Sequence, residues 1–208
     1  MEKPIKLIAV AGGIGSGKSV ICRMLRVMGY EVYDCDTMAK ALMDRSGRMK
    51  QRIAGEIGEE AIMMPADNAW ETAVIDRRRL SAIVFSDKEK LSRLNAIVHG
   101  EVIADVKRWR DGKRVGGKNV VFVESAVLYT SGLHREVDAI WYVSASESTR
   151  IERAMARDNA TREQIVARIA SQEKELAAMR QSGDNIYEID NNGERAVLPQ
   201  VLGLLRKI

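Results

Sequence analysis

Ten residues near the start of the chain, AGGIGSGKSV (11–20), combine glycines with one lysine and one serine in a pattern suited to phosphate binding. Gly12, Gly17, Lys18 and Ser19 occupy the fixed positions of G-x-x-x-x-G-K-S/T. Glycines allow backbone N–H groups to face phosphate oxygens, and the start of the following helix adds its positive dipole. In this motif the lysine reaches the β- and γ-phosphates and the serine hydroxyl ligates Mg²⁺. The pattern therefore predicts a site for a nucleoside triphosphate.

Two aspartates in the stretch YDCD could supply the carboxylate that such a site needs. Asp34 and Asp36 end a short expected strand, whose alternation would turn both aspartates the same way and Cys35 the other way. A carboxylate there can accept a proton from an attacking hydroxyl or hold the water shell of a metal ion. The alternative for either aspartate is the N-cap of the next expected helix. Glu124, which ends NVVFVE, is a possible metal-shell carboxylate, and a strand-end side chain facing solvent is an equally good interpretation.

Arginines recur at helical spacing in a third segment, TRIERAMARD, which is followed by NATREQ. They are Arg150, Arg153, Arg157 and Arg162. Phosphoryl transfer needs positive charge on the moving group, delivered when a mobile lid closes and expels water. We therefore favour a lid for this group, and the alternative is a solvated basic face paired with acidic neighbours such as Asp158.

Five apolar runs of strand length must position these residues. They span residues 5–10, 31–33, 120–123, 139–143 and 186–189. The first run (Lys6 aside) and the third are continuously apolar, as in parallel strands that are covered on both faces. Because helical patterns separate the runs, the sequence predicts an α/β fold with a parallel five-stranded sheet and helices on both faces.

Two long helical stretches interrupt this alternation within what we interpret as a single domain, 1–208. Residues 37–117 form a mainly helical insert, far longer than a simple crossover, and contain a long helix candidate that starts at Asp87. Residues 146–181 form the lid and a following helix, broken at RDNAT. In that break Thr161, followed by Gln164, predicts a capping box.

Composition narrows the class of protein. The 208 residues are 46% hydrophobic and carry 33 Lys and Arg against 29 Asp and Glu, so the net charge of +4 suits anionic ligands without requiring nucleic acid. The two cysteines, Cys22 and Cys35, are too few for a disulfide framework, which favours a reducing cytoplasm. Cys22 is expected in the core. No apolar stretch approaches the roughly 20 residues that span a bilayer, so we expect no membrane role.

These motifs together resemble the dephospho-CoA kinase family. GGIGSGKS, YDCDTMAK, IDRRRLSAIVFSDKEKLSRLNAIVH, RAMARDNATREQ and IDNNG occur in the family's order over nearly the whole chain. The resemblance implies transfer of the γ-phosphoryl group of ATP to the ribose 3′-hydroxyl of dephospho-CoA, the last step of coenzyme A biosynthesis. It also implies Mg²⁺ and a nucleoside-monophosphate-kinase-like core with a lid and a helical CoA-binding region.

The resemblance also assigns roles to residues. It makes Asp36 the general base and a substrate contact, and it places Lys18, Arg153 and Arg157 in catalysis. Residues expected at the ATP phosphates are Gly13, Gly15, Ser16, Gly17, Lys18, Ser19 and Val20. Asn191 is expected near the adenine, Arg77 and His99 in the substrate region, and Ser19 with Glu124 at the metal.

Several positions depart from the family's pattern. Val20 replaces a threonine, Gly100 replaces the proline after His99, and VESAVLYTSG stands in place of D-x-P-L-L-F-E. Glu124 thereby lengthens the carboxylate arm, while Ala126 and Thr130 remove a proline and a second carboxylate.

Two other functions remain as alternatives. Another P-loop kinase, for a nucleoside monophosphate or a hydroxy acid, would use the same loop and lid, although the long insert favours a larger acceptor. A nucleotide-dependent regulatory protein is the other, and the sequence lacks the N-K-x-D motif that GTP switches usually carry.

Overall fold

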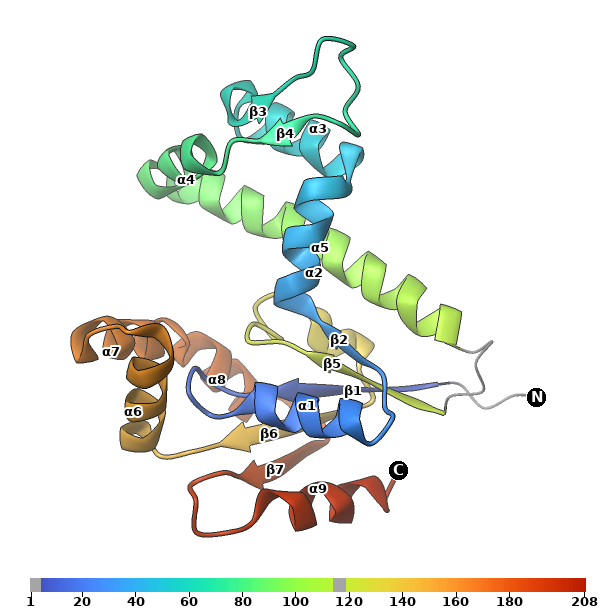
Figure 1. The fold of residues 1–208 in the computed structure, drawn as a ribbon, viewed down its shortest axis with the longest axis vertical. Coiled ribbons are helices and arrows are strands. Elements are labelled where there is room, and N and C mark those ends of the chain that lie inside the picture. Colours follow the sequence, from blue (N-terminus) through green and yellow to red (C-terminus); the bar gives the residue numbers. More distant parts are fainter. Residues whose placement is uncertain (1–4, 114–118) are drawn as a thin grey trace. The chain divides into compact units, whose positions relative to one another are not determined.

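A five-stranded parallel sheet organises the larger part of the chain (Figure 1), and the computed structural model describes residues 5–113 and 119–208. The strand order is β2-β5-β1-β6-β7. The strands are β1 (Lys6–Ala11), β2 (Val32–Asp34), β5 (Val120–Glu124), β6 (Ala139–Ser144) and β7 (Ile186–Asp190). Each neighbouring pair is parallel. The structure confirms the predicted α/β fold.

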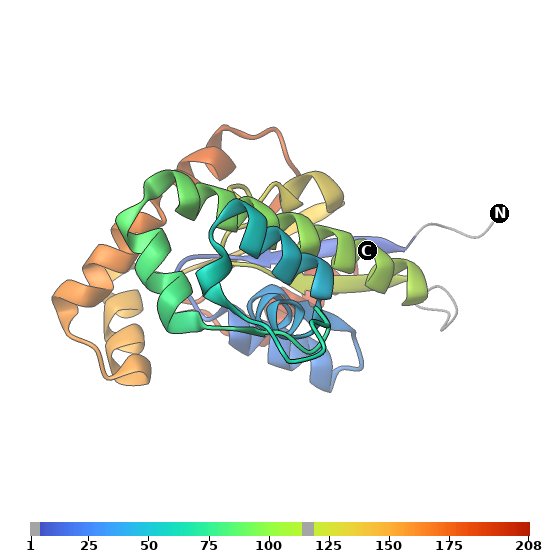
Figure 2. The ribbon, with the colours of Figure 1, turned by 90° about the horizontal axis from the view of Figure 1, so that it is seen from above.

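Helices and a helical loop cover the two faces of this sheet, as Figure 2 shows around β1. Helices α1 (Lys18–Val27) and α9 (Val197–Leu205) pack on one face, where the Phe122 and Trp141 rings lie 5.0 Å apart between centroids. The other face meets the segment 125–136, which ends in η3 (Leu133–Glu136). Because both faces are covered, residues 7–10 of β1 are at most 2% exposed, which explains their unbroken apolar run.

Residues 146–181, predicted to form a lid and a following helix, contain three helices, α6 (Glu147–Asp158), α7 (Arg162–Ser171) and α8 (Glu173–Gln181). The predicted capping box opens α7. Thr161 donates its backbone N–H to Gln164 Oε1 (3.0 Å), and Thr161 Oγ1 accepts from the Gln164 N–H (3.4 Å). The break in the helical pattern is therefore a reciprocal cap, as expected from the sequence.

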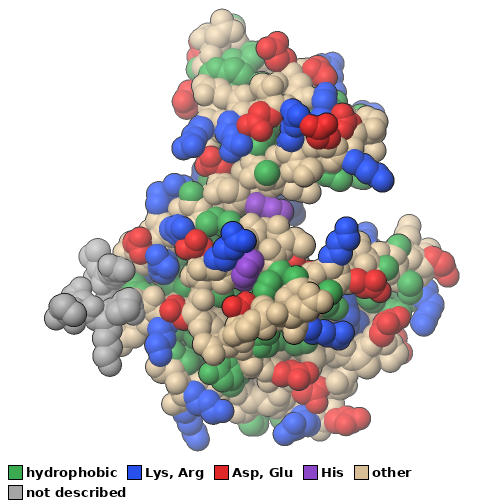
Figure 3. Space-filling model, turned by 180° about the vertical axis from the view of Figure 1, so that it is seen from behind, with side chains coloured by type: hydrophobic (Ala, Val, Ile, Leu, Met, Phe, Trp, Pro, Cys, Tyr) green, Lys and Arg blue, Asp and Glu red, His purple; other side chains and the backbone are tan. Residues whose placement is uncertain are grey.

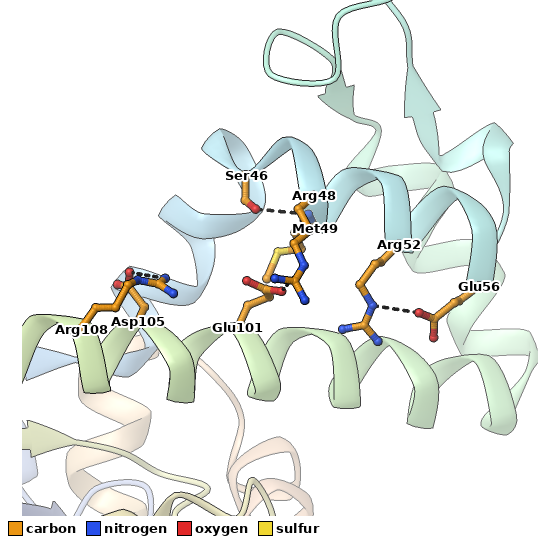
Figure 4. Close-up of polar contacts among 8 residues, drawn as sticks. All are labelled: Ser46, Arg48, Met49, Arg52, Glu56, Glu101, Asp105 and Arg108. Atoms are coloured by element: carbon orange, nitrogen blue, oxygen red, sulfur yellow. Dashed lines mark hydrogen bonds and ion pairs between the residues drawn. The ribbon is translucent and has the colours of Figure 1, made fainter.

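Residues Cys35–Trp109 form a separate compact unit. Its elements are α2 (Cys35–Arg45), α3 (Gly47–Glu56), η1 (Glu59–Ala61), β3 (Ile62–Met63), β4 (Val74–Ile75), α4 (Arg77–Ser86) and most of α5 (Lys88–Gly112). In Figure 4, Ser46 Oγ caps α3 through the Met49 N–H (3.2 Å), and Arg48 pairs with Glu101 of α5 at 3.6 Å. These contacts join α3 to α5 within the unit.

This unit departs from the predicted insert in its details. The predicted insert spans residues 37–117, of which residues 114–118 lie outside the described part of the chain. The antiparallel pair β3 and β4 was not predicted, because two-residue strands are too short to show a pattern.

The strand geometry expected for Asp34 and Asp36 is wrong. Strand β2 ends at Asp34 and α2 begins at Cys35, so Asp36 lies in the first turn of a helix. Good helix formers in TMAKALM let the helix begin before the second aspartate, and strand alternation therefore does not relate the two side chains.

Charges of both signs are mixed on the face of the molecule drawn in Figure 3. There Lys and Arg side chains lie among Asp and Glu side chains rather than in one basic patch. Among the described residues, no helix is both long and apolar enough to cross a membrane.

Candidate active site

The glycine-rich loop, residues 12–17, joins the carboxyl end of β1 to the first residue of α1, Lys18. Gly17 precedes the helix with φ 97°, and no side chain caps the helix start. Uncapped N–H groups at a helix start, together with the helix dipole, form an anion site. The loop therefore has the backbone geometry that the motif predicts for phosphate binding.

Lys18 folds back over the loop. Its Nζ donates to the carbonyl oxygens of Gly12 (2.6 Å) and Gly13 (3.3 Å). These bonds hold the ammonium group above the first two glycines, so its positive charge adds to that of the helix start.

Side chains from distant segments hold the outer side of the loop. Arg150 of α6 donates from Nε to Ile14 O at 2.9 Å, and Gln172 Oε1 accepts from the Ile14 N–H at 2.8 Å. Asn191, just after β7, donates from Nδ2 to Ser16 O at 2.8 Å. The loop conformation thus depends on residues more than 130 positions away in the chain.

Two residues expected at this site, Asn191 and Arg153, contact each other. The Asn191 backbone N–H donates to Ser144 O at 2.9 Å, and its carbonyl oxygen accepts from Arg153 Nη1 at 2.9 Å. Asn191 therefore connects Arg153 to the glycine-rich loop, because it also donates to Ser16 O.

Arg157 forms a different arrangement. It donates to Asp158 from Nε (2.7 Å) and Nη2 (3.1 Å), and Asp158 also accepts from Arg168 (2.9 Å). The bond to Asp158 raises the pKa of Arg157, and the bond from Arg157 lowers the pKa of Asp158. With 60% of its side chain exposed, Arg157 here forms the solvated ion pair that the alternative interpretation describes.

Glu124 ends β5 and pairs in register with Asp34 of β2. Burial raises the pKa of Glu124, a hydrogen bond with Cys22 lowers it, the charge of Asp34 raises it and that of Lys18 lowers it. Cys22 is fully buried, as predicted, and burial raises the pKa of its thiol. Two carboxylates thus end neighbouring strands, and Lys18 is close enough to Glu124 to affect its pKa.

The oxygens of Ser19 and Glu124 suit a hard cation that keeps most of its coordinated water molecules. Ser19 lies in the first turn of α1. Among residues 5–113 and 119–208, no three or more His, Cys, Asp or Glu side chains form a group that could hold a metal ion. Mg²⁺ is usually held by one or two protein oxygens together with substrate phosphates and water. A serine hydroxyl at the start of α1 and a carboxylate at the end of β5 are oxygen donors of the kind that Mg²⁺ prefers.

The segment after β5 is held by α8. Glu175 accepts the backbone N–H groups of Tyr129 (2.5 Å) and Thr130 (2.9 Å), and also the Thr130 hydroxyl (2.9 Å). A carboxylate therefore meets position 130 from another helix, although Thr130 itself carries none.

The other expected substrate residues belong to the unit Cys35–Trp109. Asp36 lies in the first turn of α2. Arg77 begins α4 and donates to Asp44 at 2.6 Å, and His99 lies within α5.

Sequence reasoning missed two of the loop contacts. The sequence pattern groups Arg150 with the other arginines of the predicted lid and does not place it at the loop, and no sequence pattern marks Gln172. Both contacts join a side chain to a backbone group far away in the sequence, and such contacts leave no local pattern.

Comparison with known proteins identifies the family. Residues 6–196 match the family model described as dephospho-CoA kinase. A dephospho-CoA kinase from Porphyromonas gingivalis is 35% identical over 201 residues, covering 97% of this chain and 93% of that protein. Another from Chlorobium chlorochromatii is 33% identical over 189 residues, covering 90% of this chain and 85% of that protein.

Solved structures agree on the fold. A crystal structure of a Thermus thermophilus protein has a TM-score of 0.69 and 27% identity, covering 99% of this chain and 96% of its own. A dephospho-CoA kinase from Campylobacter jejuni has a TM-score of 0.63 at 20% identity, covering 97% of this chain and 96% of its own. The family match over residues 6–196 supports neither a regulatory protein nor a kinase for another acceptor. The chain belongs to the dephospho-CoA kinase family.

Proposed function

We propose that this ATP-dependent kinase performs the family's reaction, in which the γ-phosphoryl group of ATP passes to the ribose 3′-hydroxyl of dephospho-CoA, with the residue roles given below. The observation that carries the proposal is the loop of residues 12–17, which opens onto the uncapped start of α1 with Lys18 folded over it, in a chain that matches the family over 6–196. Such a site supplies position and charge and needs no covalent nucleophile, so a direct in-line transfer fits.

The loop and Lys18 would bind the triphosphate. Backbone N–H groups between Gly13 and Val20 would donate to phosphate oxygens, and the Lys18 ammonium would neutralise the β- and γ-phosphates. Because Lys18 Nζ already lies over Gly12 and Gly13, it needs only a local side-chain movement to reach a bound phosphate.

Ser19 and Glu124 would hold Mg²⁺. When bound, the ion neutralises phosphate charge and orients the triphosphate. The Ser19 hydroxyl would be a direct ligand, and Glu124 would hold a water molecule of the ion's shell. Cys22 keeps the longer Glu124 arm in place through its hydrogen bond.

Asp36 would be the general base. It follows the last residue of β2 by two positions and lies in the first turn of α2. Its carboxylate would accept the proton of the 3′-hydroxyl as that oxygen attacks the γ-phosphorus.

The lid arginines would stabilise the charge on the moving phosphoryl group. Arg153 is tied to Asn191, whose amide holds the loop at Ser16, so Arg153 would act from a fixed position. Asn191 would also border the adenine. Arg157 would have to leave Asp158 to reach a phosphate.

Arg77 and His99 would bind dephospho-CoA. Arg77 offers an exposed guanidinium for a phosphate of the substrate, and His99 offers a ring for contact with it. In the structure Arg77 pairs with Asp44, so substrate would compete with an exposed ion pair, which costs little to break.

The test is ADP release with ATP and Mg²⁺, with dephospho-CoA, AMP, CMP, shikimate or gluconate as acceptor. Turnover should occur with dephospho-CoA alone and be lost in Lys18→Ala, whereas Lys207→Ala, which removes an exposed lysine near the chain end, should retain it. Turnover on another acceptor alone would overturn the assignment of dephospho-CoA as the substrate. Activity in Lys18→Ala equal to that of wild type would overturn the role proposed for the loop.

A further inference from the structure

Arg150 is a buried arginine in direct contact with the glycine-rich loop. The residue is only 8% exposed, and its Nε donates to Ile14 O at 2.9 Å. The guanidinium also lies against Gly13, where an added Cβ would fall 2.6 Å from Arg150 Cζ. A side chain at position 13 would therefore collide with Arg150, so this glycine makes room for the arginine.

The bond to Ile14 O determines which way the next peptide faces. In a trans peptide the C=O and N–H groups point in opposite directions. Since the Ile14 carbonyl points outward to Arg150, the N–H of Gly15 must point toward the inside of the loop. Asn191 makes the equivalent bond to Ser16 O, which turns the Gly17 N–H inward in the same way.

Arg150 also brings a charge that the loop itself leaves unpaired. Its Nη2 is buried and has no hydrogen-bond partner among the described residues. A buried, charged donor without an acceptor is costly, and that cost falls when an anion binds nearby. In the proposed function, the anion that comes to this loop is the triphosphate.

We propose that Arg150 is a positioning residue for the nucleotide: it fixes the Ile14–Gly15 peptide with its N–H inward and thereby sets the affinity for nucleotides that carry a β-phosphate. This inference rests on the proposed nucleotide site and adds to it a residue that was not expected at the loop. Arg150 acts through the backbone of Ile14 and through its charge, and it takes no part in proton transfer.

The test compares Arg150→Met with wild type in titration calorimetry with ADP, tripolyphosphate and AMP, whose single phosphate is the α-phosphate. Arg150→Met keeps an apolar stem and removes both the charge and the donor. Loss of a charged hydrogen bond predicts roughly 10- to 100-fold weaker binding of ADP and tripolyphosphate, with AMP affinity within about twofold of wild type. Steady-state kinetics should show a higher KM for ATP and an unchanged KM for dephospho-CoA.

Two further variants complete the design. Arg23→Met removes an exposed arginine from α1 and should bind every probe as wild type does. Arg150→Lys keeps the charge without the guanidinium geometry and should bind ADP more tightly than Arg150→Met. If Arg150→Met fails to fold, Arg150→Lys still tests the role of Arg150, because it should bind ADP more weakly than wild type.

The outcomes separate this inference from the proposed function. If wild type binds neither ADP nor tripolyphosphate, the proposed nucleotide site itself fails. If wild type binds both and the Arg150 variants bind them equally well, the inference alone is overturned. The same holds if the variants lose affinity for AMP to the same extent as for ADP and tripolyphosphate.

Discussion

Gly15→Ala tests whether the loop and α6 form one packed structure. Gly15 has φ +75°, and an added Cβ would lie 2.8 Å from both the Cα and the carbonyl carbon of Arg150. These are backbone atoms of a helix, so the collision cannot be relieved by a side-chain rotation. Either the loop or the start of α6 must move.

The size of the effect follows from two separate costs. A left-handed conformation costs a non-glycine residue roughly 1–2 kcal/mol. Inserting a methyl group into a packed contact adds about 1–3 kcal/mol. Gly29 provides the matched control, because it has φ +84° with nothing within 4 Å of an added Cβ. Gly29→Ala should therefore show the first cost alone, and Gly15→Ala should show both.

Urea unfolding of the two variants and wild type measures the difference, and calorimetry with ADP measures the effect on the site. Gly15→Ala should lower the free energy of unfolding by about 1–3 kcal/mol more than Gly29→Ala does. Of the two variants, only Gly15→Ala should weaken the binding of ADP. Equal losses of stability in the two variants, with wild-type ADP affinity in Gly15→Ala, would show that the contact with α6 does not constrain the loop.

Three further predictions concern charged residues. Asp36→Asn should lower turnover by roughly 10²- to 10⁴-fold while ATP affinity stays near wild type, and unchanged turnover would remove Asp36 as the base. Arg157→Ala should lower the single-turnover rate constant; a wild-type value would leave Arg157 as a solvated partner of Asp158. Asp158→Asn should lower stability at pH 7, because the pKa of Asp158 is held below its ordinary value in the folded state. That contribution is present above the ordinary pKa and is lost as pH falls through the lowered one, so urea midpoints of variant and wild type should converge in strong acid, and a constant difference would contradict the pairing.

The sheet was predictable because its signal is local. A strand that is covered on both faces is apolar at every position, and residues 7–10 show both the pattern and the burial. The cap of α7 was predictable for the same reason, since Thr161 and Gln164 lie three residues apart and bond to each other. The phosphate loop likewise consists of consecutive residues.

The start of α2 and the contacts around the loop were not predictable in this way. Whether Asp36 continues a strand or begins a helix depends on where α2 starts, and YDCD fits both. Arg150 and Gln172 bond to Ile14 from 136 and 158 residues away, so only the fold brings them together. Periodicity indicated a row of arginines but not which of them would be buried.

The junction between α7 and α8 links the loops after two different strands. Gln172 accepts the N–H of Ile14, after β1, and Glu175 accepts the N–H groups of Tyr129 and Thr130, after β5. The bonds from Ile14 and Tyr129 are partly buried, so this junction stabilises the backbone conformation of both loops. Thr130 fits the same arrangement, since its hydroxyl also donates to Glu175, whereas a carboxylate at position 130 would repel that side chain. Position 130 therefore needs no carboxylate of its own to join this loop to α8, because Glu175 accepts the bonds of Thr130.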